Sequence, residues 1–263
     1  PPVRLAPRRR RTRPGRGAYL GAQIGIIVTG GAVRLTGSGL GCSTWPQCEP
    51  GQVAARVHPA TTYHQSVEDG NRTLTGGLSV IAIAALVLVW TDRSRVLSYR
   101  LLGAVPLLGV AAQAIIGGVI VLLHLHPGWV SLHFVVSAAL VSVSLLLLHR
   151  SREGDGPPVP PVAPRSRARA GALYGLTAVV VVLGVIVTGA GPHSGDEEVG
   201  YRFAVDPALM SKVHAGAVWV FAAVLVAYLG SGRRGPLEVR RAGWILLAIT
   251  LAQGAIGYVQ YFT

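Results

Sequence analysis

Residues 24–48 read IGIIVTGGAVRLTGSGLGCSTWPQC. The stretch begins as an apolar helix, leaves the bilayer through Arg34 and a glycine-rich turn, and ends in a short loop with the two cysteines of the chain. Its central pattern, residues 28–30 (Val-Thr-Gly), recurs 159 residues later at 187–189. A repeated membrane unit with one polar end indicates a cofactor held inside a bundle of helices.

Apolar runs of about 20 residues can cross the roughly 30 Å of hydrocarbon in a bilayer. The chain has seven such runs, at 17–35, 71–90, 101–123, 129–149, 171–190, 208–229 and 242–262. Helices satisfy their own backbone hydrogen bonds in lipid, and the sequence lacks the alternation typical of a barrel. The sequence therefore predicts an all-α integral membrane protein.

The net charge of +13 follows the topology rather than a nucleic-acid site. Nineteen of the 24 Lys and Arg residues lie before the first run or in every second loop, whereas the other loops hold five basic and seven acidic residues. This is the positive-inside pattern. It predicts a multi-pass protein of the cell membrane with a cytoplasmic N-terminus, an outer cysteine loop, and basic ends that contact anionic lipid instead of nucleic acid.

An internal repeat predicts the domain organisation. Residues 108–117 resemble 247–257, with Gln113 and Gln253 offset by 140 residues, and Asn71 and His214 occupy related positions in their halves. Repeats of this kind predict two tandem four-helix bundles related by a pseudo-twofold axis. The counterpart of His133 would fall near position 273, so we expect seven helices of eight and a chain that is truncated at its C-terminus.

The predicted boundaries follow from composition. We expect a disordered basic cytoplasmic tail at 1–16, a first bundle at 17–150 with an outer loop at 36–66, a Pro/Arg-rich cytoplasmic linker at 151–170, and a second bundle at 171–263.

Two histidines near the outer ends of membrane helices are candidate ligands. Polar groups inside membrane spans are costly and are candidates for function. Imidazoles on facing helices of a bundle can bind haem iron, so His133 and His214 are candidate haem ligands, with Arg34, Arg72 or Lys212 placed to meet the propionates. The alternative is that each histidine simply hydrogen-bonds a neighbouring helix.

The segment 64–72 gathers polar groups at helical spacing. His64, Glu68 and Asn71 with Arg72 lie on one helical face, although Gly70 weakens the case for an unbroken helix. A carboxylate beside a haem edge could act as a base or stabilise positive charge. A solvated helix start is the alternative.

The two cysteines and the other histidines receive simpler interpretations. Outside the membrane, Cys42 and Cys48 are expected to form a disulfide, either as a structural staple or with a redox role. The remaining histidines are expected to be solvated at loops and helix ends; they are His58, His124, His126, His149 and His193.

These residues resemble a known family. The stretch 28–48 resembles the first outer loop of haem A synthase, 68–72 (Glu-Asp-Gly-Asn-Arg) resembles that family's Glu-x-x-His-Arg motif, and 132–134 (Leu-His-Phe) resembles the surroundings of its fourth-helix histidine. The resemblance extends over residues 17–263.

The resemblance implies an enzyme with eight helices in two halves. Such an enzyme oxidises the C8 methyl of haem O to a formyl group for terminal oxidase biogenesis, with oxygen from water. Carried onto this chain, Glu68 would be the catalytic carboxylate, His133 a ligand of substrate haem O, and His214 a ligand of haem b. Cys42 and Cys48 would form the loop disulfide. Haem O synthase and a second copy of the chain are the expected partners.

Two departures from the family pattern leave alternatives open. Asn71 stands where the family often has a histidine, so the substrate iron would be five-coordinate on His133, or His64 would substitute. The missing eighth helix would remove a haem b ligand and could leave the chain inactive. Competing functions are a haem b electron carrier, which would not need Glu68, and a small-solute transporter, which would place polar residues at mid-membrane.

Overall fold

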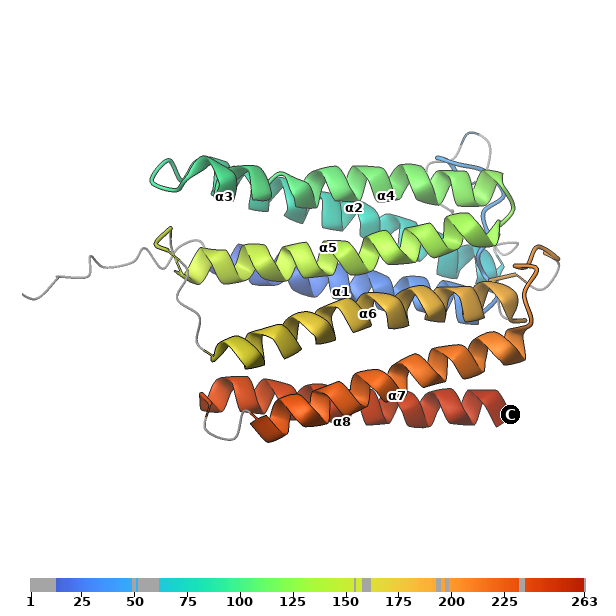
Figure 1. The fold of residues 1–263 in the computed structure, drawn as a ribbon. Helices are drawn as coiled ribbons and strands as arrows, with labels where there is room; N and C mark the ends of the chain where they lie inside the picture. The colour runs from blue at the N-terminus through green and yellow to red at the C-terminus, as the bar shows by residue number, and fades with distance from the viewer. Residues whose placement is uncertain are drawn as a thin grey trace, which may run out of the picture. The chain divides into compact units, whose positions relative to one another are not determined.

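Helices account for the regular structure of the chain. A computed structural model describes residues 13–48, 51, 62–153, 155–157, 162–192, 195–196, 199–231 and 235–262. Within these residues there is no β-strand, and the helices, labelled in Figure 1, are α1 (Arg13–Leu35), α2 (Tyr63–Trp90), α3 (Leu97–Leu102), α4 (Val105–Leu122), α5 (Pro127–Glu153), α6 (Pro164–Ala190), α7 (Pro207–Ser231) and α8 (Leu237–Phe262).

Seven helical segments in the described residues are long and apolar enough to cross a membrane, with α3 and α4 counted together as Leu97–Leu122. The prediction of an all-α, multi-pass membrane protein is confirmed. The third run differs from the prediction because α3 ends at Leu102 and α4 begins at Val105, just before Pro106. A proline lacks the backbone N–H that a continuous helix would use there.

The long helices begin earlier than the apolar runs indicated, and the difference is largest at α2. α2 begins at Tyr63 rather than Asn71, and the Thr62 hydroxyl caps it by accepting the Gln65 N–H at 3.2 Å. The helix therefore continues through Gly70. α1 begins at Arg13, within the expected tail, whose residues 1–12 lie outside the described part of the chain, as do His58 and His193.

The described helices divide into two compact units, the first of which covers residues up to 156 together with 193–201. In this unit, α1 and α4 each pack on both α2 and α5, so the four spanning segments form a closed ring. Its core includes Tyr19, Leu78, Ala82 and Val110. A Cβ on Gly109 would lie 2.2 Å from Leu140, because α4 and α5 approach closely there.

The second unit covers residues 157–192 and 202–263. Here α7 packs on both α6 and α8. Leu173 of α6 and Phe221, Leu225 and Leu229 of α7 form its buried cluster. α8 meets this cluster through Gly243, where a Cβ would lie 2.7 Å from Leu229.

An ion pair ties the turn after α2 to the end of α5 in the first unit. Arg95 donates to both carboxylate oxygens of Asp155, at 2.8 and 3.0 Å, and to the carbonyl of Arg150 at 2.9 Å. Asp155 also accepts the Val96 N–H at 3.1 Å. The hydrogen-bonded Arg95 guanidinium holds the pKa of the Asp155 carboxyl below its ordinary value of 3.8.

This ion pair predicts a pH dependence. A carboxyl whose pKa is lowered by folding adds stability above its unfolded pKa and loses it as the pH falls through its folded pKa. We expect Asp155→Asn to lower the melting temperature of detergent-solubilised protein at pH 7 by a small amount, since exposed pairs contribute little. The difference between wild type and variant should shrink below pH 3.8 and in high salt. An equal difference under all these conditions would contradict this role.

Candidate functional site

Glu68 is a buried carboxylate with two hydrogen-bonded partners. It lies in the second turn of α2 with 5% of its surface exposed. Its Oε2 accepts the backbone N–H of Cys42 at 2.6 Å, and its Oε1 accepts from the guanidinium of Arg72, one turn further along the helix. Burying a carboxylate is costly unless it is paired and hydrogen-bonded. Glu68 therefore fixes the loop of residues 36–48 onto α2.

Arg72 completes this attachment. Its second guanidinium nitrogen donates to the carbonyl of Thr44 at 2.9 Å and to that of Gln47 at 3.5 Å. The Thr44 hydroxyl also donates to the Gln47 carbonyl at 2.6 Å. The fork of an arginine can hold several acceptors in one plane, and here Arg72 joins the loop to Glu68.

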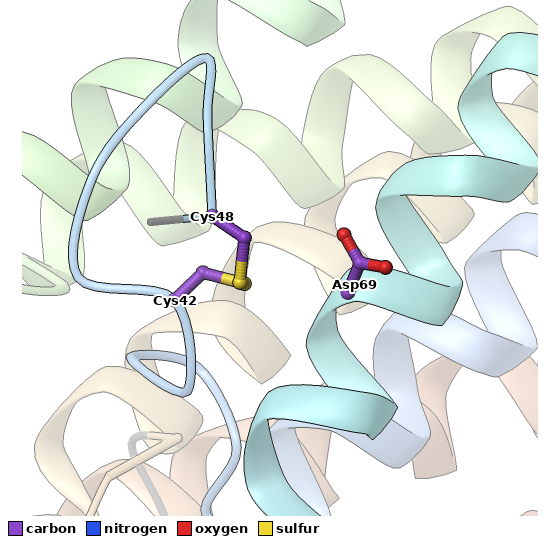
Figure 2. Close-up of side chains that lie close together, drawn as sticks. All are labelled: Cys42, Cys48 and Asp69. Atoms are coloured by element: carbon purple, nitrogen blue, oxygen red, sulfur yellow. A yellow bond between two sulfur atoms is a disulfide. The ribbon is translucent and has the colours of Figure 1, made fainter. Parts of the chain in front are cut away.

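The predicted disulfide between Cys42 and Cys48 is present. Both cysteines are buried, with 0% and 1% of their surface exposed. Figure 2 shows the Asp69 carboxylate beside the two sulfurs, and ligand atoms of the three residues lie within 4.8 Å of one another. Sulfurs joined in a disulfide are not thiolate ligands for a metal. Burial favours a structural staple over thiol exchange, which requires access to a sulfur.

Close backbone approaches seat the loop. A Cβ on Gly41 would lie 2.4 Å from the carbonyl oxygen of His64, and a Cβ on Gly118 of α4 would lie 2.6 Å from the Trp45 ring. These positions accept no side chain without movement of the loop or of its neighbours. The Gly39 N–H donates to the carbonyl of Gly195 at 2.8 Å within the same unit.

His64 and Arg34, two of the predicted site residues, lie where the loop meets its neighbours. His64 is exposed, and its Nδ1 lies 3.0 Å from the Ser38 hydroxyl. Within the described part of the chain, no hydrogen bond joins His64 to His133. Arg34, in the last turn of α1, packs beside Gly195.

Asn71 joins α2 to α1. Its side-chain oxygen accepts a 2.7 Å hydrogen bond from the hydroxyl of Thr29. Thr29 belongs to the repeated Val-Thr-Gly pattern, from which no contact of its hydroxyl was predicted. This bond uses one acceptor position of the Asn71 side-chain oxygen.

His133 lies on α5 opposite a glycine of α4. A Cβ on Gly117 would be 3.7 Å from Cε1 of the His133 ring. The ring nitrogen Nδ1 is buried and has no hydrogen-bond partner within the described part of the chain. Behind the ring, the side-chain amide of Gln113 donates to the His133 carbonyl at 2.9 Å.

His214 has similar surroundings in the second unit. A Cβ on Gly184 of α6 would lie 3.2 Å from its Cε1, and its Nδ1 is likewise buried without a partner among the described residues. In each unit, an imidazole with an unpaired buried nitrogen faces a glycine. An imidazole held in this way can bind haem iron through one ring nitrogen while the other nitrogen stays available for a hydrogen bond.

Together these features define a class: a multi-pass membrane protein whose disulfide loop is anchored on a buried carboxylate. The profile of the COX15-CtaA family, described as cytochrome oxidase assembly protein, matches residues 18–194. The chain belongs to this family.

Curated relatives carry the name Heme A synthase. The protein of Lysinibacillus sphaericus is 30% identical over 136 residues, which cover 49% of this chain and 43% of the relative. That of Halalkalibacterium halodurans is 28% identical over 166 residues, covering 63% and 53%, respectively. The chain thus spans about half the length of the relatives it matches. No solved structure matches it.

The seating of the loop can be tested at Gly41. We expect Gly41→Ala to push residues 39–43 away from α2 and to destabilise the protein by about 1–3 kcal/mol, because the new methyl meets backbone atoms that cannot rotate away. The measurements are thermal unfolding in detergent and the rate of proteolysis within the loop. Gly76→Ala is the matched control, because a Cβ there meets open space. Equal stability of the two variants would contradict the proposed contact.

Proposed function

We propose that this chain is a haem A synthase, an oxidoreductase that converts the C8 methyl of haem O into a formyl group for terminal oxidase biogenesis, with the oxygen taken from water. Family membership and the curated relatives named Heme A synthase support this function. The observation that carries it is Glu68, a buried carboxylate held between the Cys42 amide and Arg72. The resemblance assigns the catalytic role to this position.

The surroundings of Glu68 suit a catalytic carboxylate with a fixed orientation. Hydrogen bonds to both oxygens hold its orientation, and the guanidinium of Arg72 balances its charge. The loop covers the carboxylate and limits the access of water, while the remaining lone pairs can accept a proton or stabilise positive charge. Haem iron, when bound, supplies the route by which electrons leave the methyl group.

We propose one arrangement for holding haem, which follows the roles that the resemblance implies. His133 would hold substrate haem O in the first unit, and His214 would hold haem b in the second. Asn71 is engaged with Thr29 and His64 with Ser38, so we propose that His133 is the protein ligand of the substrate iron and that Asn71 fixes α1 against α2.

The wider setting follows from the same proposal. The two units would be the halves of a tandem repeat, with the N-terminus in the cytoplasm and the disulfide loop outside the cell membrane. A membrane-embedded haem O synthase is the proposed source of the substrate, and a second copy of the chain is a further proposed partner.

Haem chromatography tests the activity. In a host that makes haem O, the wild-type chain should yield haem A or its hydroxylated precursor. Glu68→Gln should lower this product by at least about 100-fold, the usual scale for loss of a general base, while haem remains bound. Asp69→Asn is the control, because it changes the neighbouring carboxylate on the same helix. Full product from Glu68→Gln would refute the role, and haem b alone from wild type would favour an electron carrier.

Absorption spectra test the ligands. We expect His214→Ala to remove the haem b signal and His133→Ala to remove the haem O signal, because each change deletes the proposed axial nitrogen. His124→Ala, a change in the turn after α4, should leave both signals intact. The contrary outcome is an unchanged spectrum in either ligand variant.

A further inference from the structure

The side-chain amide of Gln113 on α4 lies against the backbone of α5. Its Nε2 donates to the carbonyl of His133 at 2.9 Å and also to the hydroxyl of Ser137. The Ser137 hydroxyl donates in turn to the same carbonyl at 2.9 Å. A carbonyl oxygen can only accept, so the amide must direct its nitrogen toward α5, and the orientation of Oε1 is fixed as well.

This orientation leaves two complementary atoms unpaired at one helix contact. Gln113 Oε1 and His133 Nδ1 are both buried, and neither has a hydrogen-bond partner within the described residues. Unpaired buried polar atoms are rare in proteins and are destabilising. Both atoms belong to residues at the same contact between α4 and α5. There Gln113 donates to the His133 carbonyl, and Gly117, one turn further along α4, faces the His133 ring. One atom is an acceptor, and the other can carry a proton.

Metal binding by His133 would explain why Gln113 Oε1 and His133 Nδ1 lack partners. A histidine that binds a metal through Nε2 carries its proton on Nδ1, and that N–H almost always donates to a nearby acceptor. The hydrogen bond selects the tautomer and fixes the plane of the ring.

The geometry points to Gln113 as the positioning residue of His133. Its Nε2 holds the backbone of the histidine, and its Oε1 accepts the Nδ1–H, directly or through one water molecule, when Nε2 of the ring faces iron. This inference rests on the proposed function, because it takes His133 to be a haem ligand.

The repeat supplies a matched control. Gln253 of α8 stands 140 residues after Gln113 in the matching segment, but its side chain is exposed. A change at Gln253 removes the same amide from the same kind of membrane helix, in the other unit.

Two substitutions at Gln113 separate positioning from mere packing. In a His214→Ala background, the haem signal arises from the first unit, and its reduction midpoint potential is measured by titration. Gln113→Leu removes the acceptor, so the imidazole becomes a weaker donor to iron. The potential should then rise and haem retention should fall roughly 10–100-fold. Gln113→Glu supplies a stronger acceptor and should lower the potential. Gln253→Leu should change neither quantity.

The outcomes distinguish this inference from the proposed function. The positioning role would be overturned if both Gln113 variants shifted the midpoint potential in the same direction, or if neither variant shifted it. A packing defect has no reason to change the potential in opposite directions in the two variants. Thermal unfolding establishes that each variant is folded, and the potential of either folded variant alone still tests the expected direction. If the haem signal in this background survives His133→Ala, the ligand assignment in the proposed function fails instead.

Discussion

The structure of the site depends on one buried carboxylate, Glu68, which needs hydrogen-bond donors and a positive charge beside it. Glu68 is placed where water cannot solvate it, and its charge is balanced by Arg72 from its own helix and by the Cys42 amide from the loop. Removing one partner of a buried charge usually costs about 3–5 kcal/mol, because the charge that remains is uncompensated. The loop therefore cannot leave α2 without a large cost, and the residue proposed for chemistry also organises the fold around itself.

The disulfide and the glycines make this attachment possible. Joining Cys42 to Cys48 restricts the loop, which limits the conformations in which the Cys42 amide would face elsewhere. Gly41 lets the loop backbone touch the first turn of α2, and Trp45 extends the contact to Gly118 on α4. The disulfide thus has a structural role, because it keeps the backbone N–H of Cys42 in place to donate to the Glu68 carboxylate.

The sequence was sufficient for the spans and for the local part of the site. Apolar runs of membrane length predicted the seven long helices, and helical spacing placed Glu68 and Arg72 on one face, where they form an ion pair. The start of α2 was misplaced because its first turns are polar and are stabilised by the docked loop. The bonds from Cys42 to Glu68, Thr29 to Asn71 and Gln113 to His133 link positions 20–42 residues apart. They depend on the rotation of packed helices, which periodicity alone does not specify.

His133 and His214 have similar surroundings in the two units but differ in the residues that support them. His133 and His214 each have a buried ring nitrogen without a partner among the described residues, and each ring lies against a glycine of a neighbouring helix, so the same contact occurs in both units. Their supports differ, because Gln113 donates to the backbone carbonyl of His133, whereas Gln253, in the matching segment of α8, is exposed. Hydrogen bonds to an axial histidine tune the iron that it binds. Under the proposed function, these unequal supports would give the haem of each unit different properties.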